Sequence, residues 1–163
     1  MANSFHLSFY SFGKPSYNDA HKTMEGEPIM SAFTEKSQLL RDCADRHYNC
    51  AQAVVIPFAE NAGISAETAM KFAAAFGGGM RRGSVCGAVT GGLMALGLYG
   101  IDDPATLGEY HRRLKESHAG LLDCSDLLRV GAESGLPKKP YCDALVRECA
   151  ALAEEILKEK QKI

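Results

Sequence analysis

The stretch FGGGMRRGSVCGAVTGG, residues 76–92, is the most glycine-dense part of this chain, and it carries a single cysteine, Cys86. Glycine destabilises helices and strands unless the backbone needs a positive φ or another group approaches it closely. Three glycines run together at 77–79, and more follow Cys86 inside a predicted helix, residues 85–98. We therefore expect backbone to come close to a sulfur-bound group here, and another backbone or a cofactor to lie against the glycine-rich helix.

The regions on both sides of this stretch are predicted to be helical. Apolar residues recur at the spacing of an amphipathic helix, and no alternating strand pattern of useful length occurs. The predicted helices cover residues 31–46, 50–61, 66–76, 85–98, 105–118, the short segment 121–130, and 141–160. The predicted fold class is all-α, a single-domain bundle of about six helices with a glycine-rich central helix.

The N-terminal segment differs from the rest of the chain. Residues 1–30 lack helical and strand periodicity and are interrupted by glycine and proline, which is typical of a flexible leader. We assign residues 31–163 to the helical domain. A chain of 163 residues is long enough for one domain with a substantial core and too short to expect two.

Composition narrows the functional class. A formal net charge of −2 gives no electrostatic reason to expect nucleic-acid binding, which requires a basic face. No apolar run approaches the roughly 20 residues that cross a bilayer, and the N-terminus lacks the features of a secretory signal. We therefore expect a cytoplasmic protein with no nucleic-acid or membrane partner. In that compartment cysteines are more often metal ligands or redox-active thiols than structural disulfides.

The six cysteines occur singly, without a Cys-x-x-Cys pair. Four are predicted in the first turn of a helix: Cys50 after the N-cap Asn49, Cys86 after the N-cap Ser84, Cys124, and Cys142 after Pro140. The free N–H groups and the dipole of a helix start stabilise a thiolate and lower its pKa. Four such thiols from separate elements are what a thiolate-bound metal or cluster requires. The other two, Cys43 and Cys149, are expected to face the core as small hydrophobic residues.

These residues resemble a known family. The segments that carry the resemblance are NCAQAV (49–54), FGGGM (76–80) and CGAVTGGLMALGL (86–98), followed by Cys124 and Cys142. Over roughly residues 33–157 they resemble the C_GCAxxG_C_C family of redox-active proteins. The family label puts glycine before the central cysteine, whereas this chain has the order Cys86-Gly87-Ala88. The fold of the family is similar to the cluster-bearing part of split-Soret cytochromes, in which cysteines hold an iron–sulfur centre.

The resemblance implies a cofactor and a role. It implies that the chain binds an iron–sulfur cluster, with [2Fe–2S] as the favoured form, for electron transfer or redox sensing. The implied ligands are Cys50, Cys86, Cys124 and Cys142. The expected partner is a redox protein whose identity the sequence does not give, and a homodimer is one option for the assembly.

Three other hypotheses remain open at this point. The same four thiolates suit a structural zinc site, because Zn²⁺ accepts tetrahedral Cys₄ coordination. Two of the cysteines could instead cycle to a disulfide in a metal-free thiol oxidoreductase. The chain could also be a helical scaffold whose cysteines only fill the core. The glycines around Cys86 favour the iron–sulfur hypothesis over the scaffold.

Overall fold

The structure is a computed structural model that describes residues 30–163. The predicted leader, residues 1–30, lies outside the described residues apart from Met30. The elements in chain order are α1 (Ala32–Asp42), α2 (Cys50–Asn61), α3 (Ala66–Phe72), the π-helical turn η1 (Gly79–Gly83), α4 (Gly87–Leu98), α5 (Pro104–Ser117), α6 (Cys124–Glu133) and α7 (Lys138–Glu159). Within residues 30–163 there is no strand, so the all-α prediction is confirmed. The seven α-helices correspond to the seven predicted segments, one more than the expected total of about six.

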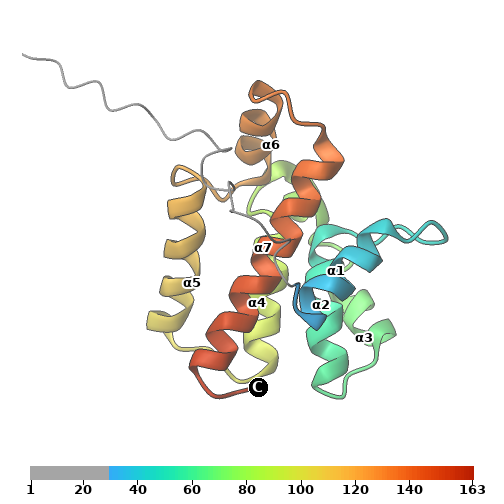
Figure 1. Ribbon diagram of the computed structural model, residues 1–163, viewed down its shortest axis with the longest axis vertical. Coiled ribbons are helices and arrows are strands. Elements are labelled where there is room, and N and C mark those ends of the chain that lie inside the picture. Colours follow the sequence, from blue (N-terminus) through green and yellow to red (C-terminus); the bar gives the residue numbers. More distant parts are fainter. Residues whose placement is uncertain (1–29) are drawn as a thin grey trace, which may run out of the picture.

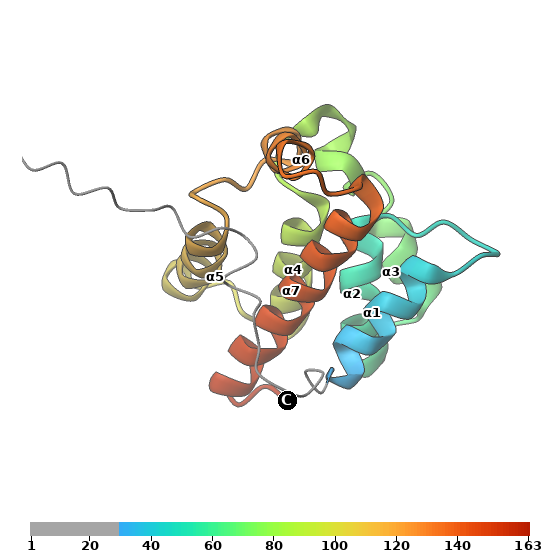
Figure 2. The same ribbon diagram turned by 45° about the horizontal axis from the view of Figure 1, so that its top comes forward.

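The helices α2, α4 and α7 pack against one another at the centre of the bundle. The long helix α7 crosses the molecule in front of α4, with α1, α2 and α3 on one side, α5 on the other and α6 at one end (Figures 1 and 2). The largest fully buried side chains include Phe58, Leu96, Leu114, Ile156 and Leu157. The N-terminal ends of α2, α4 and α7 all point toward the end of the bundle that carries α6 (Figure 1).

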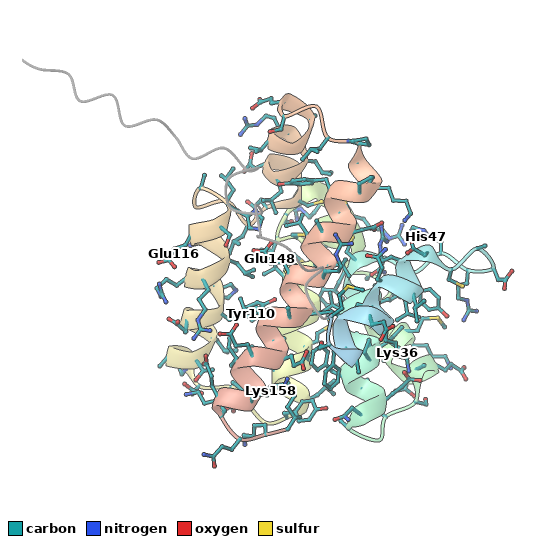
Figure 3. The ribbon with its side chains drawn as sticks, viewed as in Figure 1. Lys36, His47, Tyr110, Glu116, Glu148 and Lys158 are labelled. Carbon is teal, nitrogen blue, oxygen red and sulfur yellow. The ribbon has the colours of Figure 1, made fainter. Side chains whose placement is uncertain are left out.

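The glycine-rich helix α4 packs closely against its neighbours, as the sequence predicted. A β-carbon on Gly91 would lie 2.8 Å from the carbonyl oxygen of Ala51, so the backbone of α2 occupies the space of a side chain. A β-carbon on Gly92 would lie 2.0 Å from the hydroxyl of Tyr110, which donates a hydrogen bond to the Val89 carbonyl. Figure 3 shows Tyr110 reaching from α5 toward the central helices. These glycines therefore let α2 and α5 reach the axis of the bundle.

Two predicted helices end earlier than expected. The first stops at Asp42 because Cys43 is already extended, with ψ at 119°. The third stops at Phe72. Just beyond this end, the Asn49 side-chain amide donates to the carbonyls of Ala73 and Ala74, at 3.2 and 3.1 Å.

Two predicted helix starts are also corrected. The fourth helix begins at Gly87 rather than at residue 85, because residues 84–86 run extended and Ser84 is not its N-cap. The last begins at Lys138, three residues before the predicted start, and includes Pro140. Proline is tolerated in a first turn because its missing N–H would have no partner there. Leu145, Cys149, Leu152 and Ile156 lie on the buried side of this last helix.

No helix within residues 30–163 is both long enough and apolar enough to cross a membrane.

Candidate functional site

The four cysteines predicted as ligands line one cavity. Cys50 and Cys124 open α2 and α6, Cys86 is the N-cap of α4, and Cys142 is the fifth residue of α7. The cavity that they line measures about 10 Å³. That is room for about one water molecule. The other lining residues are Gly87, Leu127, Leu128 and Leu145. The site therefore combines four sulfurs with an apolar wall.

A complete capping arrangement positions Cys50 as the first residue of α2. The backbone amide of Gln52 donates to Asn49 Oδ1, and the backbone amide of Asn49 donates to Gln52 Oε1, both at 2.9 Å. This reciprocal capping box fixes the start of the helix. It confirms Asn49 as the predicted N-cap. A β-carbon on Gly77 would lie 2.5 Å from Asn49 Cβ, so the first glycine of the 77–79 run makes room for the cap.

A short antiparallel bridge brings Cys86 and Cys124 together. Val85 and Asp123 pair, with the Cys86 amide donating to Leu122 O at 2.8 Å and the Cys124 amide donating to Ser84 O at 2.7 Å. Successive side chains alternate across extended backbone, so the residues that follow a bridged pair lie on the same face. The two cysteines therefore share a face, although the sequence has no alternating pattern that would have predicted it.

Two glycines allow cysteines to approach this face. A β-carbon on Gly79 would lie 2.9 Å from Cys124 Cβ and 2.2 Å from the Ser84 carbonyl oxygen. One on Gly87 would lie 3.3 Å from Cys50 Cβ. Real Cβ contacts are rarely this short, so glycine is required at both positions. The glycines around Cys86 thus bring backbone close to sulfur-bearing residues, as expected.

Cys142 lines the same cavity as Cys50. Its thiol is the largest single influence on the pKa of Cys50. Cys142 does not lie in a first turn, because α7 begins four residues earlier, at Lys138. The packing of α7 against α2, rather than a helix cap, therefore brings Cys142 to the cavity.

The buried side chain of Arg41 in α1 connects the segments that carry Cys50 and Cys142. Its Nε donates to Asp143 Oδ1 and its Nη1 to the Tyr48 carbonyl, both at 2.7 Å. Asp143 follows Cys142 directly, and Tyr48 lies two residues before Cys50. The side chains of Arg41 and Asp143 are only 8% and 6% exposed. Sequence reasoning missed Arg41 because its partner is 102 residues away and no local motif marks it.

The surroundings of the four thiols shift their pKa values in different directions. The Cys142 thiol and the charge of Arg41 together lower the pKa of Cys50 to about 7 against the opposing effect of burial. The Cys50 thiol, together with burial, raises the pKa of Cys142. Burial raises the pKa of Cys86 to about 12 and also raises that of Cys124.

The predicted lowering of all four pKa values by helix starts is therefore wrong for three of them. Cys86 is the N-cap of α4, and the nearby Ala88 and Val89 amides lower its pKa without a capping hydrogen bond of standard geometry. Their effect is smaller than that of burial, which removes water from the thiolate.

The two cysteines assigned to the core differ from each other. Cys149 is fully buried beside Tyr110, as expected. Cys43 ends α1 and is only partly buried, because the helix stops before it. Neither lines the four-cysteine cavity.

The donor set suits a thiolate-bound cluster. The cavity is lined by four thiols and by no histidine or carboxylate. Among residues 30–163, no three His, Cys, Asp or Glu side chains converge as the ligands of a single metal ion. The cavity measures about 10 Å³, so the sulfurs would have to move apart to hold a cluster.

Comparison with known proteins bears on the same residues. Residues 48–156 match a family model described as "Putative redox-active protein (C_GCAxxG_C_C)". This range contains all four cavity cysteines and does not contain Arg41. Neither the curated proteins nor the solved structures gave a match.

Proposed function

Because the chain belongs to the C_GCAxxG_C_C family, we propose that it is a redox protein that binds an iron–sulfur cluster through Cys50, Cys86, Cys124 and Cys142. The observation that carries this proposal is that these four cysteines, from four helices, line the same cavity. Four cysteine thiolates are the usual ligands of [2Fe–2S] and [4Fe–4S] clusters. We favour the [2Fe–2S] form.

Two centres could use these four thiolates. A structural zinc needs four ligands converging on one point at about 2.3 Å. A cluster distributes its four cysteines over two or more irons, so its ligands need not converge on one atom. The family match to a redox-active protein supports the cluster, because zinc has no redox chemistry.

A bound cluster supplies one-electron transfer, and the surrounding residues would control it in three ways. Leu127, Leu128 and Leu145 keep water from the sulfurs, and the amides near Cys86 would tune the potential as N–H donors. The positive charge of Arg41, which acts on both Cys50 and Cys142, favours the more negative, reduced state. The role that we propose is electron transfer or redox sensing with a redox partner protein, either as a monomer or as a homodimer.

Iron and acid-labile sulfide analysis of anaerobically purified protein, together with the visible spectrum, tests this function. We expect a coloured protein with iron and sulfide in equal amounts. Changing any one of the four cavity cysteines to alanine should abolish both the iron and the colour.

The matched controls are Cys43→Ala and Cys149→Ala, which should keep the cluster because neither cysteine lines the cavity. Loss of iron in both controls, with retention in Cys124→Ala, would show that the ligands were wrongly chosen. Stoichiometric zinc without sulfide would instead indicate a structural zinc protein.

A further inference from the structure

We propose that Met80, Arg81 and Arg82, in the turn η1, form the docking surface for an acidic electron-transfer protein. We call these three residues the 80–82 surface. The inference rests on the proposed function, because it gives the chemistry of the redox partner that this function requires.

The turn η1 is anchored beside one of the four cavity cysteines. It packs against α6, which begins with Cys124 (Figure 2). At one end of the turn, a β-carbon on Gly79 would lie 2.9 Å from Cys124 Cβ. At the other end, Ser125 Oγ donates to the Gly83 carbonyl at 3.1 Å. The 80–82 surface therefore lies between two fixed points next to the cavity, and a protein bound there would be close to the proposed cluster.

The backbone of this turn is strained while its side chains stay in solvent. Residues 78–81 all have left-handed backbone, with φ between 53° and 62°. Glycine adopts this conformation freely, but Met80 and Arg81 carry side chains that make it unfavourable. Such strain persists only where the surrounding structure imposes it, and it occurs frequently at functional sites. Met80 is 42% exposed, and Arg81 and Arg82 are exposed as well, so the strain presents these side chains rather than burying them.

Arg81 and Arg82 are the two arginines without a side-chain partner within residues 30–163. The six others are engaged: Arg41, Arg112, Arg113 and Arg129 bind carboxylates, Arg147 donates to Gln38, and Arg46 donates to the Met70 sulfur. A guanidinium with no internal partner keeps all its donors for a group on another molecule. Its planar fork matches a carboxylate, which it binds through two parallel hydrogen bonds.

The composition of the 80–82 surface indicates the kind of partner. Methionine and arginine are both enriched at protein interfaces. Two positive charges beside one apolar side chain complement a patch of aspartates or glutamates around an apolar contact. The whole chain carries a formal net charge of −2, so a local basic surface is needed to orient an acidic partner. Electron-transfer complexes bury little surface, and a compact patch beside the cluster suits them.

An NMR titration of the purified full chain with a flavodoxin, a small acidic electron carrier, tests this inference. We expect the amide signals of residues 80–82 to shift at low ionic strength. They should return toward their free positions in about 1 M salt, where charges are screened beyond about 3 Å. The double variant Arg81→Gln/Arg82→Gln should bind about tenfold more weakly, because two exposed ion pairs are lost.

The matched control is Lys160→Gln/Lys162→Gln. It also removes two positive charges, but from the chain beyond α7, at the opposite end of the bundle from α6 (Figure 1). It should bind as tightly as the unchanged protein. No binding at low ionic strength, shifts confined to another face, or equal weakening in the two double variants would overturn the inference.

The titration is repeated with metal-free protein whose circular dichroism shows the helical fold, and iron and sulfide content report separately on the cluster. Protein without iron that binds through the 80–82 surface would contradict only the proposed function. A cluster protein that does not bind there would contradict only this inference.

Discussion

A β-carbon on Gly87 would lie 3.3 Å from the β-carbon of Cys50 and 2.8 Å from the carbonyl oxygen of Phe76. Gly87 is the first residue of α4 and follows Cys86 directly. The missing side chain lets the start of α2 lie against the start of α4. Two cysteines that are far apart in the sequence therefore meet at one cavity.

The substitution Gly87→Ala should disturb this contact. The new methyl group meets backbone that cannot easily move, and such overpacking costs about 1–3 kcal/mol. We expect a lower free energy of unfolding in urea denaturation and a reduced iron content. The matched control is Gly97→Ala on the same helix, where a β-carbon meets nothing within 4 Å. Alanine should be neutral there or stabilise by up to about 1 kcal/mol. Equal effects of the two substitutions would contradict this account.

The substitution Arg41→Met should destabilise the protein strongly. It leaves Asp143 as a buried carboxylate, 4% exposed, that has lost one of its two cationic partners. Breaking a buried ion pair on one side costs about 3–5 kcal/mol, and the remaining Lys139 contact should keep the loss near the lower value.

The exposed pair of Lys71 and Glu67, with side chains 71% and 70% exposed, provides the control. Lys71→Ala should change the free energy of unfolding by less than about 1 kcal/mol. If thermal or urea unfolding gave Arg41→Met and Lys71→Ala the same small effect, the proposed clamp between α1, α2 and α7 would not exist.

Cys50 should be the most reactive of the cavity thiols in metal-free protein. Its pKa is lowered to about 7, so the thiolate fraction rises as pH increases through 7 and falls below it. Cys86, whose burial raises its pKa to about 12, should stay protonated at neutral pH. Iodoacetamide labelling followed by mass spectrometry should show Cys50 modified first, with a rate midpoint near pH 7. Faster labelling of Cys86 at neutral pH would refute this assignment.

The substitution Asn49→Ala should affect both stability and the site. Loss of an N-cap costs about 1 kcal/mol, and Asn49 also donates to the carbonyls of Ala73 and Ala74. Ser65, the N-cap of α3, provides the control because it caps a helix that carries no cysteine. We expect Asn49→Ala and Ser65→Ala both to lower the melting temperature. Only Asn49→Ala should lower iron content, and an equal loss of iron in both variants would argue against a role for this cap at the site.

Local signals in the sequence predicted much of the fold. Asn49 was identified as an N-cap because cap preferences act over three or four residues. The all-α class of the fold followed from helical periodicity. The close approach at Gly91 followed from the stability that glycine costs in a helix. The four cysteines of the cavity were also identified, from their places near helix starts and from the family resemblance.

The features that sequence reasoning missed depend on distant contacts. The bridge between Val85 and Asp123 moves the start of α4, and its hydrogen bonds join segments nearly 40 residues apart by sequence number. The ion pair of Arg41 with Asp143 spans 102 residues. The raised pKa values of Cys86 and Cys124 arise from burial, which the helix-start argument does not contain. In each case tertiary structure overrides a local rule.

Iron K-edge X-ray absorption of anaerobically purified protein tests the central claim most directly. If the four cavity cysteines hold one cluster, the spectrum should show iron surrounded by sulfur alone, with a second iron as a near neighbour. Iron bound to nitrogen or oxygen, or protein that takes up no iron under these conditions, would contradict it.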